Sequence, residues 1–327
     1  MSRPLPGPAR VTVEAPARLH FGILDLRGHL GRKFGGIGAA VPSPSLLLEV
    51  TPGDQLTTEG PEAGRAQEFA HRYLDAVGLR HGAHLKVHRA IPAHVGLGSG
   101  TQLALSVARA LAELHGQASD PLTLARLVGR GHRSAIGTWT FALGGFVLEG
   151  GRRTGSDAVA PLISRLPIPS AWRAVIAIPE GQPGLSGVAE AEAFKELPPP
   201  TEREVERVAH LVLMQLLPAL ADGDLMAFGA ALTEVQRITG GWFAKAQGGA
   251  FAGSTRDLVD RLAEFGACGV GQSSWGPTVY GLAPHEDAAR DLAQRVRAHL
   301  GGRGLVLATP FAERGALVNS QWSQVGA

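Results

Sequence analysis

The segment PAHVGLGSGTQ, residues 92–102, has the residue types of a loop that binds an anion. Gly96, Gly98 and Gly100 have no side chains that would keep a phosphate away from the backbone. The segment before them alternates apolar and polar residues as a strand does, and apolar residues follow at the four-residue spacing of a helix. A glycine loop between a strand and a helix presents unpaired N–H groups and the positive end of the helix dipole to its ligand. The sequence therefore predicts a phosphate-binding loop.

The spacing of these glycines does not match the better-known nucleotide loops. No lysine follows the last glycine, as a Walker A loop requires, and the pattern is not GxGxxG. The chain contains 44 glycines, so a purely structural turn is the alternative for this segment.

The elements around the loop suggest an N-terminal unit built from a hairpin and helices. We expect a strand over residues 9–23, a glycine-rich loop from Gly28 to Gly38, and a second extended run over 43–52 that pairs with the first. The segment GRAQEFAHRYLDAVG has apolar residues at helical spacing and ends at Gly78, which is typical of a glycine C-cap.

The middle of the chain contains a short helix, a strand and a change of composition. Asp120 followed by Pro121 predicts the start of a helix over 122–128, and GGFVLEGG predicts a strand. Residues 151–170 lose periodicity and contain three prolines. We therefore expect two domains, 1–165 and 166–327.

The second half mixes strands and helices without regular alternation. AVIAIP predicts a buried strand, and Thr201 with Glu204 forms a capping-box pattern before a long helix. Further helices are expected to begin near Asp224, Ser254 and Glu286, and two short extended runs surround the glycine turn in GVGQSSWGPTVYGL. This order favours an α+β fold.

Composition narrows the classes of function. The 327 residues are 44% hydrophobic and 18% charged, with a formal net charge of +2 and no long run of Lys and Arg. These features argue against a nucleic-acid partner. The single cysteine, Cys268, indicates a reducing compartment, and no run of 18 apolar residues suggests a membrane span, so we expect a cytoplasmic protein.

Five segments together resemble one family. PARLHFGILDLRG, GRKFGGIG, PAHVGLGSGTQLAL, RGHRSAIG and GQSSWGPTVYG are similar to the motifs of the β-ribofuranosylaminobenzene 5′-phosphate synthase family, in the GHMP kinase superfamily. The resemblance implies a two-domain fold, with an N-terminal domain like the second domain of ribosomal protein S5 and a ferredoxin-like C-terminal domain. It also implies a homodimer.

The resemblance implies a decarboxylating C-ribosyl transfer. Phosphoribosyl pyrophosphate would join 4-aminobenzoate or 4-hydroxybenzoate through a carbon–carbon bond, with release of carbon dioxide and pyrophosphate, in tetrahydromethanopterin biosynthesis. No organic cofactor is implied. Cys and His residues lack metal-ligand spacing, although Mg²⁺ could arrive with the diphosphate.

Two other functions fit the same scaffold. One is an ATP-dependent small-molecule kinase, but many GHMP kinases have a segment like PSGID, and Gly137 stands here where that aspartate would be. Loss of a proton acceptor argues against activation of a hydroxyl nucleophile. The other is a non-catalytic protein that binds a phosphate ligand or RNA.

Cations in the matched segments are candidates for holding the diphosphate, because arginine binds phosphate in a bidentate manner. Arg32 and Arg133 are the first candidates, and Arg18, Lys33 and Arg130 are the others. A solvated surface position is the alternative for each of them.

Asp25, Arg32 and His20 are the predicted catalytic residues. Asp25 follows an apolar strand and could stabilise the electron-poor sugar carbon, hold a ribose hydroxyl or bind a metal; its alternative is to cap the turn before Gly28. His20 lies two residues from Arg18 and shares its strand face, although a structural role is the alternative.

Uncharged residues of the matched segments complete the predicted substrate site. Trp139 or Trp275 could stack on the aromatic acceptor, with a core position as the alternative for Trp139 in particular. We expect the Gln102 side chain to reach the space that a nucleotide base would occupy in a kinase. The remaining candidates are Gly96, Gly98, Ser99, Gly100, Thr101, Ser134, Gln272 and Ser273.

Overall fold

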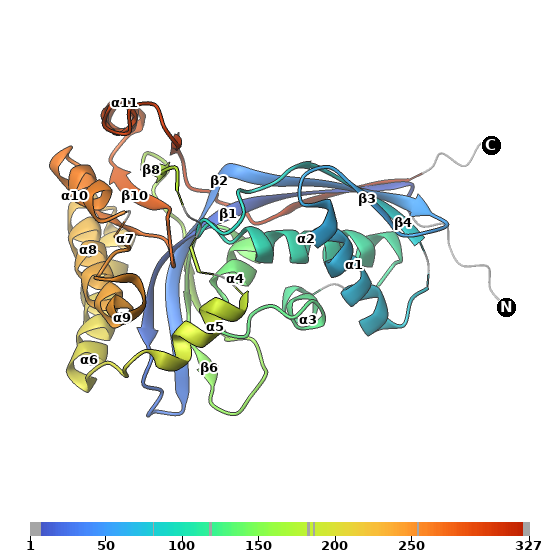
Figure 1. Ribbon diagram of the computed structural model, residues 1–327, viewed down its shortest axis with the longest axis horizontal. Coiled ribbons are helices and arrows are strands. Elements are labelled where there is room, and N and C mark those ends of the chain that lie inside the picture. The colour runs from blue at the N-terminus through green and yellow to red at the C-terminus, as the bar shows by residue number, and fades with distance from the viewer. Residues whose placement is uncertain are drawn as a thin grey trace.

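A long antiparallel hairpin organises the fold (Figure 1). The computed structural model describes residues 8–322 except 81, 118, 119, 182, 183, 186 and 254. Strands β1 (Arg10–Asp25) and β2 (Arg32–Gly53) pair along almost their whole length. Alternate residues of β1 are buried from Arg10 to Ala15, as expected for a strand that places one face on the core. From Ala15 to Ile23 every residue except Arg18 is buried, so both faces of this part are covered.

Within the described residues the first sheet has eight strands, with the path β12-β1-β2-β4-β3; β5 and β6 also pair with β2, and β7 pairs with β5. The remaining strands are β3 (Thr57–Glu59), β4 (Gly82–Arg89), β5 (Phe146–Glu149), β6 (Arg152–Arg153), β7 (Leu162–Leu166) and β12 (Leu317–Gln321). The last of these, from the C-terminal end of the chain, pairs with the first residues of β1.

The expected loop from Gly28 to Gly38 is wrong over most of its length, because β2 already begins at Arg32. Its glycine-rich part pairs with β1 on one side and β5 on the other, so strand hydrogen bonds stabilise it despite poor intrinsic propensity. The glycine at position 38 permits this packing, since a Cβ there would lie 2.5 Å from the Leu19 carbonyl oxygen.

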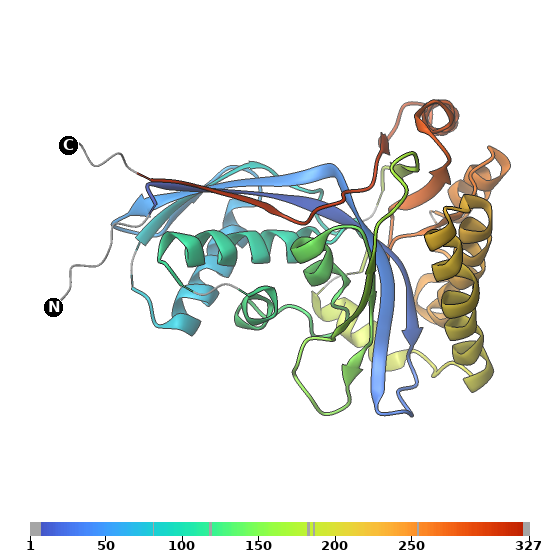
Figure 2. The ribbon, with the colours of Figure 1, turned by 180° about the vertical axis from the view of Figure 1, so that it is seen from behind.

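Four helices cover one face of the first sheet (Figures 1 and 2). The expected helices and caps are confirmed: Gly78 caps α1 with φ 69°, and the Asp120 carboxylate accepts hydrogen bonds at the start of α3. The helix before β5 was not predicted from the sequence. The four are α1 (Ala63–Val77), α2 (Ser99–Leu114), α3 (Pro121–Leu127) and α4 (Ile136–Leu143).

The second sheet has four antiparallel strands in the order β11-β8-β10-β9. They are β8 (Arg173–Ile178), β9 (Val270–Gln272), β10 (Val279–Ala283) and β11 (Leu305–Thr309). The expected strand AVIAIP and the two short runs around the glycine turn are thus confirmed. Helices α10 (Arg256–Glu264) and α11 (Glu286–His299) pack on this sheet around a separate apolar cluster.

The helices between β8 and α10 lie against the far part of the hairpin, as both views show. The capping box of Thr201 and Glu204 and the N-cap at Asp224 are confirmed. Ser254, the expected start of the next helix, lies outside the described residues. These elements are α5 (Gly187–Glu196), α6 (Glu202–Leu211), a π-helical turn η1 (Val212–Leu216), α7 (Leu217–Asp222), α8 (Leu225–Trp242) and α9 (Ala244–Gln247).

The main core joins the two halves of the chain. The Phe21 ring on β1 lies 5.1 Å from that of Tyr280 on β10, and Phe146 lies 6.1 Å from Phe228 on α8. The α+β class is confirmed, while a boundary between residues 165 and 166 stays a prediction. No helix in the described part of the chain is long and apolar enough to cross a membrane.

Candidate functional site

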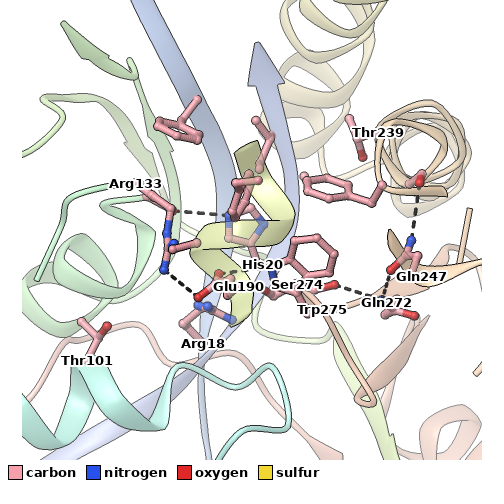
Figure 3. A pocket seen from close by; sticks show the side chains of 18 of the residues that line it. Arg18, His20, Thr101, Arg133, Glu190, Thr239, Gln247, Gln272, Ser274 and Trp275 are labelled. Atoms are coloured by element: carbon pink, nitrogen blue, oxygen red, sulfur yellow. Dashed lines mark hydrogen bonds and ion pairs between the residues drawn. The ribbon is translucent and has the colours of Figure 1, made fainter. Parts of the chain in front are cut away.

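A cavity of about 430 Å³ lies where the two halves of the chain meet. Its walls come from β1, the segment 129–134 before α4, helix α5, the end of α8 and the turn between β9 and β10 (Figure 3). One end is cationic and includes Arg18, Arg130 and Arg133. The other is rich in aromatic rings and side-chain amides, so the cavity has two chemically different ends.

Arg18 fixes the glycine loop against β1. Its guanidinium donates to the Gly96 carbonyl oxygen, and its backbone N–H donates to the Leu97 carbonyl at 3.1 Å. Gly98 has φ 77°, and a Cβ there would lie 2.8 Å from Cγ of Arg18. Burial lowers the pKa of Arg18 to about 10, against the opposing charge of Glu190, so the side chain stays cationic at neutral pH.

Ser273 ties the same loop to the second half of the chain. Its hydroxyl donates to the Gly96 carbonyl at 2.7 Å and accepts from the His20 backbone N–H at 2.9 Å. At Gly96, φ is 87° and a Cβ would lie 2.1 Å from the Ser273 carbonyl oxygen, so only glycine fits. Ser273 is fully buried and does not line the cavity. Ser273, a predicted substrate ligand, therefore connects the glycine loop, β1 and the turn after β9 instead of facing the cavity.

Positive charge is concentrated at the start of α2. A Cβ on Gly100 would lie 2.6 Å from Nη2 of Arg65 and 3.3 Å from Nη2 of Arg130. Burial, together with the charges of Arg65, Arg72 and Arg133, lowers the pKa of Arg130 to about 10. Its buried Nε has no hydrogen-bond partner within the described residues. Arginines and a helix N-terminus together suit a ligand with several negative charges.

His20 lines the cavity as a neutral imidazole. Burial, and then the charge of Arg18, lower its pKa to about 3. Its Nε2 lies 3.4 Å from the Ser134 hydroxyl, which also lines the cavity. These two side chains can donate hydrogen bonds to a ligand or accept them from it, and neither adds charge at neutral pH.

Glu190 on α5 is a site residue that the sequence analysis missed. Its Oε2 lies 2.7 Å from Nη2 of Arg133, and its Oε1 accepts from Nε1 of Trp275 at 3.1 Å. It is the one Asp or Glu among the described residues that line the cavity. No sequence signal marks it, because α5 follows a glycine-rich segment and carries no recognisable motif.

The second end of the cavity is built from aromatic rings in edge-to-face contact. The Trp275 ring lies 4.8 Å from Phe243 and 5.4 Å from Phe194, and Phe34 packs against Phe194 at 5.8 Å. Such a wall can hold a planar aromatic ligand and keep water away from it. Polar side chains also line the cavity, namely Gln236, Thr239, Gln247 and Gln272.

Gln272, a predicted substrate ligand, lies in the cavity wall but is held by protein groups. Its Oε1 accepts from the Thr255 hydroxyl at 2.6 Å and from the Ala252 N–H at 2.9 Å. Its Nε2 donates to the Ser274 carbonyl at 3.0 Å and to Oε1 of Gln247 at 3.2 Å. Gln272 thus orients Gln247 and the turn that carries Trp275.

Several other predicted residues lie outside the cavity. Asp25 adopts its turn-capping alternative, since its Oδ1 accepts from the N–H groups of Arg27 at 2.6 Å and Gly28 at 3.0 Å. Arg32 donates to the Gly151 carbonyl at 2.8 Å and lines a separate cleft. Lys33 has its Nζ 5.8 Å from the Phe34 ring centre, at the exposed end of the hairpin.

The expectation that Gln102 reaches a nucleotide-sized space is wrong. Its side chain is fully buried and donates from Nε2 to the Gly137 carbonyl at 3.0 Å, so it joins α2 to α4. Trp139 also lies outside the cavity, where its Nε1 donates to the Ala160 carbonyl at 3.0 Å. Of the predicted loop residues, Thr101 lines the cavity, whereas Gly96, Gly98, Ser99 and Gly100 shape the backbone beneath it.

Comparisons with known proteins match this chain to proteins of the GHMP kinase fold. Residues 64–145 match the model described as "GHMP kinases N terminal domain", and residues 216–302 match "GHMP kinases C terminal". The homoserine kinase structure from Cytophaga hutchinsonii superposes with a TM-score of 0.70 at 17% identity and covers 98% of this chain and 99% of that one. This likeness shows the fold alone.

Two further relatives are much closer in sequence. The β-ribofuranosylphenol 5′-phosphate synthase of Methanothermobacter thermautotrophicus is 34% identical, covering 94% of this chain and 98% of the relative. The protein of the same name from Archaeoglobus fulgidus is 34% identical over 83% of this chain and 87% of the relative.

Proposed function

The chain belongs to the β-ribofuranosylphenol 5′-phosphate synthase family, and we propose that it transfers the ribosyl 5-phosphate group of phosphoribosyl pyrophosphate to 4-hydroxybenzoate or 4-aminobenzoate. Carbon dioxide and pyrophosphate are released, and the product is a β-ribofuranosyl arene 5′-phosphate. In the cell this reaction would serve tetrahydromethanopterin biosynthesis.

The observation that carries this proposal is the division of one cavity into a cationic end and an aromatic end. A phosphorylated sugar diphosphate needs the first, and a benzoate ring needs the second. The cationic end, with Arg133, adjoins the aromatic end, with Trp275, because both side chains bind Glu190 and Cζ of Arg133 lies 5.4 Å from the Phe194 ring centre. The two substrates would therefore meet there as well.

The reaction replaces one bond at ribose C1 and one bond at the ring carbon by a new bond between these two carbons. No proton is transferred at the attacked ring carbon. As the C1–O bond of the ribose breaks, its electron pair leaves with pyrophosphate. A π electron pair of the ring then forms the new bond from the carbon that bears the carboxylate. Breakage of the ring–carboxylate bond returns its pair to the ring, releases carbon dioxide and restores aromaticity.

The side chains of the cavity provide the corresponding binding groups. Arg18, Arg130 and Arg133 would hold the phosphates together with the N-terminus of α2, and they would stabilise the leaving diphosphate. The aromatic wall would hold the ring and exclude water, which otherwise would hydrolyse the activated sugar. We assign Asp25 and Arg32 to the turn and edge of the hairpin instead of to the reacting atoms.

A kinase reaction has less support. A Cβ on Gly137 would lie 3.0 Å from Cγ2 of Thr101, so an aspartate at this position would require the Thr101 side chain to move. The position that carries an aspartate in many kinases of this fold is a glycine in this chain, so no carboxylate is available there to accept a proton.

Mg²⁺ is proposed only as a companion of the diphosphate. The described residues contain no group of three or more His, Cys, Asp or Glu side chains that could hold a metal ion. Glu190 is the one carboxylate of the described cavity wall, and Arg133 already binds it. The ion would therefore take most of its ligands from substrate oxygens and water.

A homodimer in the cytoplasm completes the proposal. Exposed apolar side chains on neighbouring helical segments, Leu213, Met214 and Met226, would suit a subunit contact. Sedimentation equilibrium of the purified protein tests this arrangement, and a monomer at micromolar concentration would contradict it.

The reaction is tested with phosphoribosyl pyrophosphate and 4-hydroxybenzoate or 4-aminobenzoate labelled at the carboxylate carbon. We expect labelled carbon dioxide and pyrophosphate in equal amounts, with neither product formed when one substrate is omitted. A parallel reaction contains ATP in place of phosphoribosyl pyrophosphate. If the reaction with ATP forms ADP only when the acceptor is present, and the reaction with phosphoribosyl pyrophosphate releases no labelled carbon dioxide, the proposal is overturned in favour of a kinase.

A further inference from the structure

The reacting sugar carbon needs a negative neighbour that the arginines cannot provide. When pyrophosphate leaves, C1 and the ring oxygen of the ribose gain positive charge in an oxocarbenium-like transition state. Arg18, Arg130 and Arg133 stabilise the leaving group but oppose this second charge. The sequence predicts Asp25 for this stabilising role, but its carboxylate accepts hydrogen bonds from backbone N–H groups of a turn outside the cavity.

Glu190 is the acidic side chain that the described cavity wall does provide. Its charge acts on Arg18 and Arg130 and lies in direct contact with Arg133. It therefore stands among the groups that would hold the diphosphate, and the side chain is 21% exposed. A carboxylate that is mostly shielded from water interacts with a nearby charge more strongly than an exposed one does.

The position of Glu190 coincides with the boundary between the two ends of the cavity. Arg133 on the cationic side and Trp275 on the aromatic side each hold one of its oxygens. The new carbon–carbon bond has to form at this boundary, because it joins the sugar to the ring. Figure 3 shows Glu190 between the Arg18 and Arg133 side chains and beside Trp275.

On the basis of the proposed function, we propose that Glu190 is a catalytic residue whose carboxylate faces ribosyl C1 and stabilises the positive charge that develops there. The carboxylate exchanges no proton with either substrate, in agreement with the bond changes above. The hydrogen bond from Trp275 and the ion pair with Arg133 fix its direction before the substrate arrives. Such preorganisation makes an electrostatic group effective in a transition state.

An anchoring role for α5 is the competing explanation. This helix has no fully buried residue, and Glu190 attaches it to the body of the protein through Arg133 and Trp275. If anchoring were its only role, loss of the charge would weaken binding of both substrates and would leave the chemical step unchanged.

The test compares the kinetics of Glu190→Gln, Glu190→Asp and the control Glu192→Gln. Glu192 lies on the same helix but is exposed, so the control removes the same charge away from the cavity. We expect Glu190→Gln to lower kcat by about 100-fold, as removal of one electrostatic contact to a transition state commonly does. The dissociation constant for pyrophosphate should stay within about three-fold, because Arg133 becomes freer to bind it. Glu190→Asp should keep more activity than Glu190→Gln, since it retains the charge.

A second readout reports on the sugar carbon itself. The secondary tritium isotope effect with phosphoribosyl pyrophosphate labelled at C1 should rise in Glu190→Gln, because cleavage of the C1–O bond becomes more fully rate-limiting. An unchanged isotope effect with kcat close to that of Glu192→Gln would overturn the inference. So would weakened pyrophosphate and benzoate binding that accounts for the whole loss of activity.

Failure of this inference differs from failure of the proposed function. If the wild-type protein releases no carbon dioxide from the two substrates, the proposed reaction is wrong. If the wild-type protein is active and Glu190→Gln matches Glu192→Gln, only the role of Glu190 is wrong. Circular dichroism establishes that each variant is folded. If Glu190→Gln does not fold, the kinetics of Glu190→Asp are compared with those of wild type instead.

Discussion

Glu149 is a buried carboxylate that the proposed reaction does not use. It ends β5, has no exposed surface, and accepts backbone hydrogen bonds from Gly151 at 2.8 Å and Ala135 at 3.3 Å. Burial raises its pKa from 4.5 to about 7, although the two N–H donors act in the opposite direction. Ala135 follows Ser134 of the cavity directly, so Glu149 supports the segment that carries Ser134 and Arg133.

We predict that Glu149 makes the protein less stable as the pH rises from about 4.5 to about 7. In this window the folded protein binds more protons at this site than the unfolded chain, so the free energy of unfolding falls by about 3 kcal/mol. Above the raised pKa the difference is constant. Urea unfolding of wild type and Glu149→Gln between pH 4.5 and 8 measures the free energy of unfolding at each pH.

The difference between these two stability curves should slope through the window. Exposed Glu68 provides the control, since Glu68→Gln should give a curve parallel to that of wild type. Parallel curves for Glu149→Gln would contradict the assigned burial effect.

Residues of the site could be predicted from the sequence where chemistry and glycine spacing coincide. Arg18, His20 and Arg133 lie in such segments and line the cavity. Asp25 lies in one too, but its carboxylate is short and the following N–H groups are nearer than the cavity. Glu190 gave no local signal, because its position depends on how α5 packs against distant segments.

At the scale of elements, Ser273 shows how a turn in the second half holds the glycine loop of the first. The loop could be predicted because a strand, glycines and a helix follow one another in the sequence. The hydrogen bond that attaches the loop could not be predicted, because its donor, Ser273, is 177 residues away from Gly96 in the sequence. The same limit explains the hairpin: β2 begins at Arg32 because β1 and β5 pair with its glycines, which local propensity disfavours in a strand.

Replacement of Ser273 by alanine should destabilise the protein by about 2 kcal/mol, because the buried N–H of His20 loses its acceptor. Gly96 keeps the hydrogen bond from Arg18 at its carbonyl oxygen, so its share of the loss is smaller. Chemical unfolding at pH 7 measures the change. Ser170→Ala, at an exposed position, is the matched control and should lie close to wild type. Equal stability of the two variants would show that the joint is weak.

For the whole molecule, composition and element order were enough to predict an α+β fold with two groups of elements. They were insufficient to predict that the final strand, β12, returns to pair with β1, or that α8 packs on the same hairpin. Phe21, Phe228 and Tyr280 belong to one core that spans both halves. Such long-range pairing depends on the complete set of apolar faces, so no single segment specifies it.

Because the cavity walls come from both halves, an anion bound in it should stabilise the whole fold. Pyrophosphate at about 100 times its dissociation constant would add about 2.7 kcal/mol, which for a chain of this size corresponds to a rise in Tm of about 4 °C. Arg130→Met should abolish most of this rise, since Arg130 lines the cationic end. Arg126→Met is the control, because Arg126 is exposed on α3 and should leave the rise intact. Thermal unfolding followed by circular dichroism measures all three proteins, and an equal rise in both variants would place the anion elsewhere.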